Sequence, residues 1–285
     1  MGKTHHFKRL AIVLLIMTLA LVTAACGNNN DTKEKKEMTA WDKIKKEGTI
    51  TVATAGTLYP ASFHESKTDK LTGFEVEVVR EMAKRMGLKV NFVEMAFDGM
   101  LASINSGKVD VAANDIAITN ERKEKFAFST PYKFSFASAI VRKSDLSGIK
   151  TVEDIKGKKA AGEATTTYMK IARKYGAEEV TYDNATNEQY LRDVSSGRTD
   201  IIINDYYLQK LALAAFPKLN ITIHPDLKFN TRDEGVGMIM KKENKELNEN
   251  INKTIQQMID DGTITKISKQ FFDGADVTKK PDVKY

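Results

Sequence analysis

The sequence predicts an α/β protein that consists of two similar lobes, and three observations support this prediction. From Thr49 onward, segments with the apolar spacing of a strand alternate with segments that have the apolar spacing of a helix. This alternation is typical of α/β proteins. A ten-residue pattern occurs twice in the chain. Both copies follow an amphipathic segment of helical period, so each copy is expected to occupy the same place in its own lobe.

The first folded segments are expected to form a strand, a helix and a second strand. Residues 49–53 (TITVA) are β-branched or apolar, and residues 88–94 alternate between polar and apolar side chains. Between them, Lys84 and Arg85 fill the last turn of a predicted helix, and Gly87 ends it. The apolar face of this helix consists of Phe74, Val78, Val79, Met82 and Met86. Strand, helix and strand in this order predict the start of a parallel sheet.

The repeated pattern is SGKVDVAAND at residues 106–115 and SGRTDIIIND at residues 196–205, with five of ten positions identical. Apolar residues at helical spacing precede each copy: Met100, Leu101 and Ile104 in one case, and Tyr190, Leu191 and Val194 in the other. Each copy therefore predicts a helix, a glycine stop, a short buried strand and an Asn-Asp pair. This shared order predicts two lobes of the same design.

The two Asn-Asp pairs, Asn114-Asp115 and Asn204-Asp205, follow the predicted strands directly. Ligands of open α/β sheets bind beyond the carboxyl ends of the strands, so facing lobes would place both aspartates in one cleft. In the alternative interpretation, each aspartate only caps the helix that follows it.

The chain has to cross between the lobes twice. Residues 139–142 (AIVR) are the predicted outgoing strand, and residues 235–240 (GVGMIM) are the predicted return strand, whose glycines could absorb a hinge rotation. Residues 251–272 then predict two amphipathic helices, interrupted at Asp261-Gly262 and packed on the first lobe.

The N-terminus has the features of an export signal. Lys3, Lys8 and Arg9 precede an apolar run from Leu10 to Val22, which is too short to span a bilayer. Residues 1–25 are therefore expected to be a signal peptide, and 26–40 a flexible polar tether. Cys26 is the single cysteine, and the run LVTAACG resembles a lipoprotein cleavage box. We expect Cys26 to carry the lipid anchor, with two acyl chains.

Charge and composition exclude several classes of function. Removing the three basic leader residues from the 44 in the chain leaves 41 against 38 acidic residues, and the signs alternate along the chain. Such a charge distribution argues against nucleic-acid binding. Only His64 and His224 follow the leader, and no metal-ligand spacing, phosphate loop or nucleophile–base pair is present. We therefore expect neither a metal nor a cofactor, and no catalytic residues.

The chain resembles the family 3 extracellular solute-binding proteins of amino-acid ABC transporters from Trp41 to Phe272. The matching segments are LTGFEVEVVREMAKRMG, SGKVD, ITNERKEKFAFSTPY, IKTVEDIKGKKAAGEATTT, SGRTDIIIND and MIDDGTITKISKQFF. GTLYPASFH, KFAFSTPY and YDNATNEQYL are most similar to the cystine-binding lipoproteins of Gram-positive bacteria.

This resemblance implies a two-lobed, type II periplasmic-binding-protein-like fold with two hinge strands. The expected boundaries are 41–140 for the first part of lobe 1, 141–235 for lobe 2 and 236–285 for the segment that returns to lobe 1. It also implies a monomer on the extracellular face of the cell membrane, which delivers an amino acid, L-cystine by likeness, to an ABC permease. Cysteine, cystathionine and other polar amino acids remain alternatives, as do a dehydratase-like enzyme or a sensor or adhesion module of the same fold.

The resemblance also implies the residues of the ligand site. Arg122 would bind the ligand carboxylate, which suits the two parallel hydrogen bonds that a guanidinium donates. Thr165 and Thr166 would assist at the start of a helix, although Ala164 stands where the family usually has glycine. Asp205 would bind the ligand ammonium. The remaining expected site residues are Asn114, Asp115, Tyr59 and Phe97.

Two features of the first loop bear on the side chain of the ligand. Whether Leu58 or Tyr59 faces the ligand stays open, because the loop GTLYPASF is shifted by one residue relative to the family pattern. Ala55 stands where the family often has an acidic residue, which suits a ligand without a cationic side chain.

Overall fold

The computed structural model describes residues 38–182, 185–231 and 234–282. The predicted signal peptide (residues 1–25), Cys26 and the tether up to residue 37 lie outside the described residues. No helix in the described part of the chain combines the length and the apolar character needed to cross a membrane.

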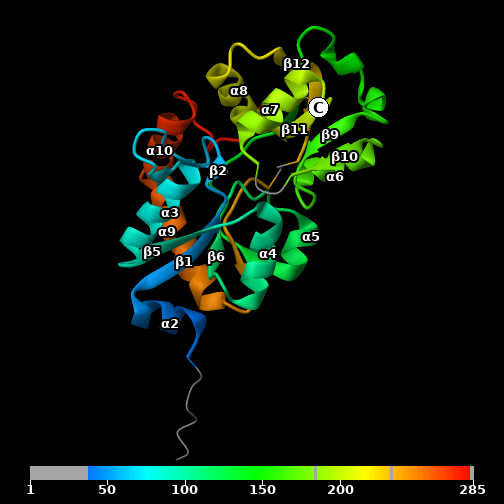
Figure 1. The fold of residues 1–285 in the computed structure, drawn as a ribbon. Helices are drawn as coiled ribbons and strands as arrows, with labels where there is room; N and C mark the ends of the chain where they lie inside the picture. The colour runs from blue at the N-terminus through cyan, green and yellow to red at the C-terminus, as the bar shows by residue number, and fades with distance from the viewer. Residues whose placement is uncertain (1–37, 183–184, 232–233, 283–285) are drawn as a thin grey trace, which may run out of the picture. The chain divides into compact units, whose positions relative to one another are not determined.

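The first sheet has the strand order β5-β1-β6-β13-β7, of which β5, β1 and β6 are labelled side by side in Figure 1. Its central strand β1 pairs in parallel with β5 and β6, and β13 is antiparallel to both β6 and β7. The strands are β1 (Thr49–Thr54), β5 (Lys89–Glu94), β6 (Val111–Ala112), β7 (Phe126–Phe128) and β13 (Ile239–Lys241). The predicted strand, helix and parallel strand at the start of the fold are thus confirmed.

Helices cover both faces of this sheet, which explains why the inner strands β6 and β13 are buried on both sides. Val52 and Val111 point into one core, and their neighbours Ala53 and Ala112 point into the core on the opposite face. The first core contains helices α2 (Ala40–Glu47), α3 (Phe74–Arg85), α9 (Lys245–Asp260) and α10 (Thr263–Phe271), and the second contains α4 (Phe97–Ser106). The two C-terminal helices pack on α3, as their amphipathic pattern predicts.

The second lobe repeats this arrangement strand for strand. Strands β10 and β9 are parallel, an Ala160–Ile201 bridge joins β9 to the β11 segment in parallel, and β8 is antiparallel to both β11 and β12. The order β10-β9-β11-β8-β12 therefore corresponds to β5-β1-β6-β13-β7. These strands are β8 (Ala137–Arg142), β9 (Lys159–Gly162), β10 (Glu178–Thr181), β11 (Ile202–Asp205) and β12 (Ile221–Phe229). The predicted two-lobed α/β fold is confirmed.

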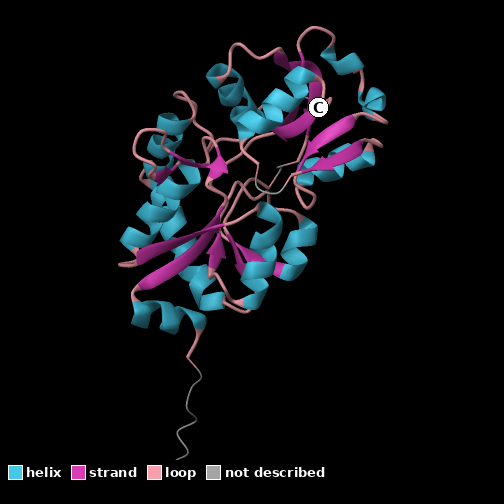
Figure 2. Cartoon of the chain, in the orientation of Figure 1, coloured by secondary structure: helices cyan, strands magenta, loops and turns pink. Residues whose placement is uncertain are grey.

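The helices of the second lobe also cover two faces (Figure 2). They are α6 (Thr167–Lys174), α7 (Asn187–Ser196) and α8 (Tyr206–Ala215), with short 3-10 turns at Leu146–Gly148 and Val152–Ile155. In both copies of the repeat, helix α4 or α7 ends at a left-handed glycine, Gly107 or Gly197. The remaining elements are α5 (Asn120–Lys125) and the small sheet of β2 (Thr57–Leu58), β3 (Ser62–His64) and β4 (Leu71–Thr72).

The chain crosses between the sheets at residues 129–136 and returns at 230–238, because β7 and β13 belong to the first sheet and β8 and β12 to the second. Lys133 and Val236 form an antiparallel bridge between the two crossing segments. The predicted outgoing strand, residues 139–142, lies within β8, which belongs to the second sheet. The run from Ala137 to Val141 is buried throughout, which requires a central strand rather than a linker.

Candidate ligand-binding site

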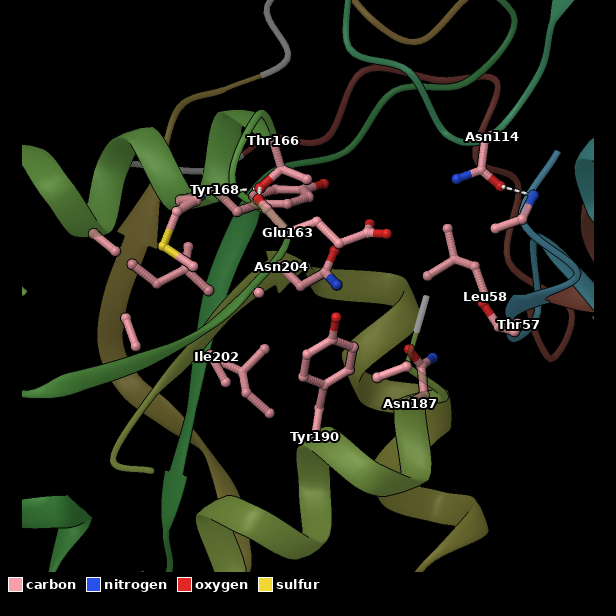
Figure 3. Close-up of a pocket in the computed structure, with 18 residues that line it drawn as sticks. Thr57, Leu58, Asn114, Glu163, Thr166, Tyr168, Asn187, Tyr190, Ile202 and Asn204 are labelled. Carbon is pink, nitrogen blue, oxygen red and sulfur yellow. Dashed lines mark hydrogen bonds between the residues drawn. The ribbon is translucent and has the colours of Figure 1, made fainter. Parts of the chain in front are cut away.

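Two adjoining cavities lie beyond the ends of the strands, and they share six lining residues. The shared residues are Leu58, Asn114, Glu163, Thr166, Tyr168 and Asn204. Leu58 and Asn114 come from the first lobe and the other four from the second, so both lobes form one continuous site (Figure 3). The larger cavity has about 640 Å³ of empty space, its open mouth included.

Arg122 lies at the wall of the smaller cavity, on helix α5. Its Nη1 donates to the carbonyl of Ala117 at 3.0 Å, and its Nη2 donates across to the carbonyl of Thr165 at 3.4 Å. The guanidinium stacks on Phe97, with Cζ 5.3 Å from the ring centre. The backbone carbonyls and the ring hold the buried guanidinium in place. Arg122 and Phe97, both expected in the site, line the same cavity.

The first turn of helix α6 lines the same cavity, but the pair of lining threonines begins one residue later than the expected pair, Thr165 and Thr166. Thr166 is the N-cap, and its hydroxyl accepts from the backbone N–H of Met169 at 3.1 Å. Thr166 and Thr167 line the smaller cavity. Thr165 lines neither cavity, because its hydroxyl and its backbone N–H both bond to Asp98 of the first lobe.

Glu163 is a lining residue that the sequence analysis missed. It directly follows β9, and its Oε1 accepts from the backbone N–H of Phe97 at 3.1 Å. Burial, followed by the charge of Glu163, raises the pKa of Tyr190 in the wall of the larger cavity. One signal was available: Glu163 is an acidic residue at the carboxyl end of a small, apolar strand, where α/β folds bind ligands.

Asn114 and Asp115 both reach the site. The side-chain oxygen of Asn114 accepts from the backbone N–H of Ala55 at 3.0 Å, which ties the first loop to β6. Asp115 has a left-handed backbone, with φ 57°, and lines the smaller cavity.

The aspartates of the two repeats converge, as predicted from their matching positions, but they converge on a lysine. Lys133 Nζ lies 2.8 Å from Asp115 Oδ1 and 2.7 Å from Asp205 Oδ2. The three side chains are 1%, 3% and 0% exposed, respectively. Asp205 Oδ1 accepts from the backbone N–H of Leu208 at 3.0 Å and so caps α8. Asp205, expected to contact the ligand, therefore lines neither cavity, whereas its neighbour Asn204 lines both.

The first loop presents Leu58 rather than Tyr59 to the site. Leu58 lines both cavities. Tyr59 is exposed, and its ring packs edge-on against Phe63, with 4.8 Å between the ring centres. The carbonyl of Tyr59 accepts from the side-chain amide of Asn187 at 3.0 Å, so Tyr59 links the lobes through its backbone.

The described residues contain no cluster of histidine, cysteine and carboxylate side chains that could hold a metal ion. The polar groups of the site are a guanidinium, carboxylates, amides and hydroxyls. This set suits a small polar molecule with charged groups of both signs.

Known proteins resemble this chain over most of its length. Residues 50–274 match the bacterial extracellular solute-binding proteins, family 3. The chain is 60% identical over 282 residues to the probable ABC transporter extracellular-binding protein YckB of Bacillus subtilis, which covers 98% of this chain and 97% of that protein. It is 38% identical over 272 residues to the L-cystine-binding protein TcyA of the same organism, covering 95% and 98%.

A crystal structure of B. subtilis YckB has a TM-score of 0.68 and 64% identity, and the alignment covers 86% of this chain and 98% of that one. These relatives are binding proteins of transporters, so the chain is a binding protein rather than an enzyme. With its two-lobed α/β fold of type II, the chain belongs to the bacterial extracellular solute-binding proteins of family 3.

Proposed function

We propose that this protein is the substrate-binding component of an amino-acid ABC importer and that it captures L-cystine. The observation that carries the proposal is the cavity that both lobes line, with a buried guanidinium from one lobe and a helix N-terminus from the other. A relative named for L-cystine binding, TcyA, covers almost the whole chain.

Arg122 and the first turn of α6 would hold the α-carboxylate of the ligand. The guanidinium donates in a planar fork that matches a carboxylate. The N–H group of Thr167, at the positive end of the helix dipole, adds a donor in the same cavity. The stacked ring of Phe97 keeps the guanidinium in one orientation.

The larger cavity would hold the rest of the ligand. Its apolar wall includes Ala161, Met169 and Ile202, and its polar wall includes Asn187 and Tyr190. The disulfide of cystine is apolar and suits the first wall. The amide and hydroxyl groups of the second wall suit the distal amino-acid head group. This distal head group is a zwitterion without net charge, so hydrogen-bonding groups of both kinds, donors and acceptors, suit it.

Ligand binding would favour the closed arrangement of the lobes, because the ligand touches both lobes only in that arrangement. Contacts around the cavity support this mechanism. Phe97 N–H bonds to Glu163 at 3.1 Å, Thr165 N–H to Asp98 at 3.0 Å, and Asn187 to the Tyr59 carbonyl at 3.0 Å. The permease would then recognise the closed monomer, which Cys26 tethers to the extracellular face of the membrane through a lipid.

The ligand assignment can be tested on the cleaved, folded protein. A thermal-shift screen would cover the common amino acids, L-cystine, D-cystine and L-cystathionine, with calorimetry on the hits. We expect L-cystine to give the largest shift and D-cystine a much smaller one. A larger shift with cysteine, cystathionine or another polar amino acid would replace the ligand and keep the transport role. A panel without any hit would contradict amino-acid binding itself.

A further inference from the structure

The family resemblance implies that Asp205 binds the ligand ammonium, but both oxygens of this carboxylate already accept hydrogen bonds inside the protein. One of its oxygens accepts from Lys133 Nζ at 2.7 Å, and the other accepts from Leu208 N–H at 3.0 Å. Its side chain is fully buried, and it lines neither cavity. A ligand ammonium would have to displace Lys133 to reach it, at the cost of leaving a buried ammonium without its partner.

Glu163 is the carboxylate best placed to replace Asp205 in this role. It lines both cavities, and it shares the smaller one with Arg122 and the start of α6. In Figure 3 its carboxylate points into the cavity beside Asn204 and opposite Leu58. The hydrogen bond from Phe97 N–H, at 3.1 Å, fixes one of its oxygens at the boundary between the lobes.

The ligand itself requires such an arrangement. In an α-amino acid, the carboxylate and the ammonium are attached to the same carbon. Their two receptors must therefore lie on one small cavity, with a cation for one group and an anion for the other. Arg122 and Glu163 meet this requirement, because both line the smaller cavity.

We propose, on the basis of the function proposed above, that Glu163 binds the ligand ammonium. Asp115, Lys133 and Asp205 then form a structural ion cluster, in which Asp115 lines the smaller cavity and Asp205 lines neither cavity. Selection for an amino acid over its deaminated analogue then depends on Glu163. Since the same carboxylate also accepts from Phe97 of the other lobe, recognition of the ammonium and contact between the lobes share one side chain.

Calorimetry tests this proposal by comparing two compounds, L-cystine and 3,3′-dithiodipropionate. The second compound is cystine without its two ammonium groups. We expect the wild type to bind L-cystine about 30-fold or more tightly than the analogue. Glu163→Gln should weaken L-cystine binding by a similar factor and change binding of the analogue by less than about threefold, so that the preference is lost. Glu163→Asp keeps the charge on a shorter side chain, so its preference for L-cystine should lie between those of the wild type and Glu163→Gln.

Two further variants make the result specific. Glu178→Gln, at an exposed position of β10 in the same lobe, should keep the full preference. Thermal unfolding of each variant checks that it is folded. If Glu163→Gln keeps the wild-type preference while Asp205→Asn loses it, the ammonium binds at Asp205 and the proposal is wrong. Equal wild-type affinity for both compounds would also overturn it, because no ammonium would then be recognised.

The result separates this inference from the proposed function. If L-cystine does not bind, the same comparison is made with L-cysteine and 3-mercaptopropionate. If either amino acid binds and is still preferred over its deaminated analogue in Glu163→Gln, the role of Glu163 is refuted and the proposed function stands. Absence of binding by every amino acid in the panel refutes the proposed function.

Discussion

Replacing Lys133 with methionine removes the ammonium that joins the two lobes at the crossing segments. Methionine keeps most of the length of the side chain but carries no charge. In the wild type, Nζ lies 2.8 Å from Asp115 and 2.7 Å from Asp205. The variant therefore leaves two buried carboxylates facing an apolar group.

The expected loss follows from the burial of this cluster. Removing one partner of a buried ion pair costs about 3–5 kcal/mol of the free energy of unfolding, because it leaves an uncompensated buried charge. At about 2–4 °C per kcal/mol for a chain of this size, the melting temperature should fall by about 6–20 °C. Adding Asp205→Asn to the Lys133→Met variant removes one of the two uncompensated carboxylate charges. The double variant should therefore recover part of the lost stability.

Urea unfolding followed by circular dichroism measures the effect. The matched control is Lys123→Met, since Lys123 pairs with Glu234 at 2.6 Å but the side chains are 41% and 47% exposed. Exposed pairs contribute about 0–1 kcal/mol, so this variant should unfold nearly like the wild type. If Lys133→Met lost no more stability than Lys123→Met, the cluster would not hold the crossing segments together.

Three further predictions concern the ligand, the pH and the anchor. Arg122→Ala should cost about 2–5 kcal/mol of ligand-binding free energy in calorimetry, whereas the exposed control Arg192→Ala should cost nothing; equal affinities would remove Arg122 from the site. Hydrogen bonding to Glu94, with Asp69 second, raises the pKa of His64 above its ordinary value. The stabilisation by His64 should therefore be complete below about pH 6.5 and lost as the pH rises through the raised pKa. Because the side chain is 36% exposed, the difference in unfolding free energy between wild type and His64→Gln should stay under about 1 kcal/mol; an unchanged difference from pH 5 to pH 8.5 would contradict this reasoning. Cys26→Ser should release the protein from the membrane fraction into the medium, as cell fractionation and immunoblotting would detect, and full retention would exclude lipid attachment at Cys26.

Local patterns in the sequence determined the type and the order of the elements. The period of apolar residues in α3, the glycine stops at Gly107 and Gly197 and the break between α9 and α10 all depend on neighbours within a few positions. The repeated ten-residue pattern also predicted the correspondence of β6 and β11, because both copies carry the same local signals. Arg122 and Thr166 could be predicted as lining residues from their place in the family motifs, Asn114 from the repeated pattern and Phe97 as an aromatic residue near the first loop.

The tertiary structure alone decided which groups meet. Thr165 and Thr166 are alike in sequence, and only the contact of Thr165 with Asp98 separates their roles. Lys133 lies 72 positions from Asp205, and no local pattern reports a charge pair at that separation. The physical reason is that periodicity specifies which side of an element is buried. The partners of a buried charge depend instead on how distant elements pack, and this packing places Asp205 in an internal ion cluster and Glu163 at the cavity.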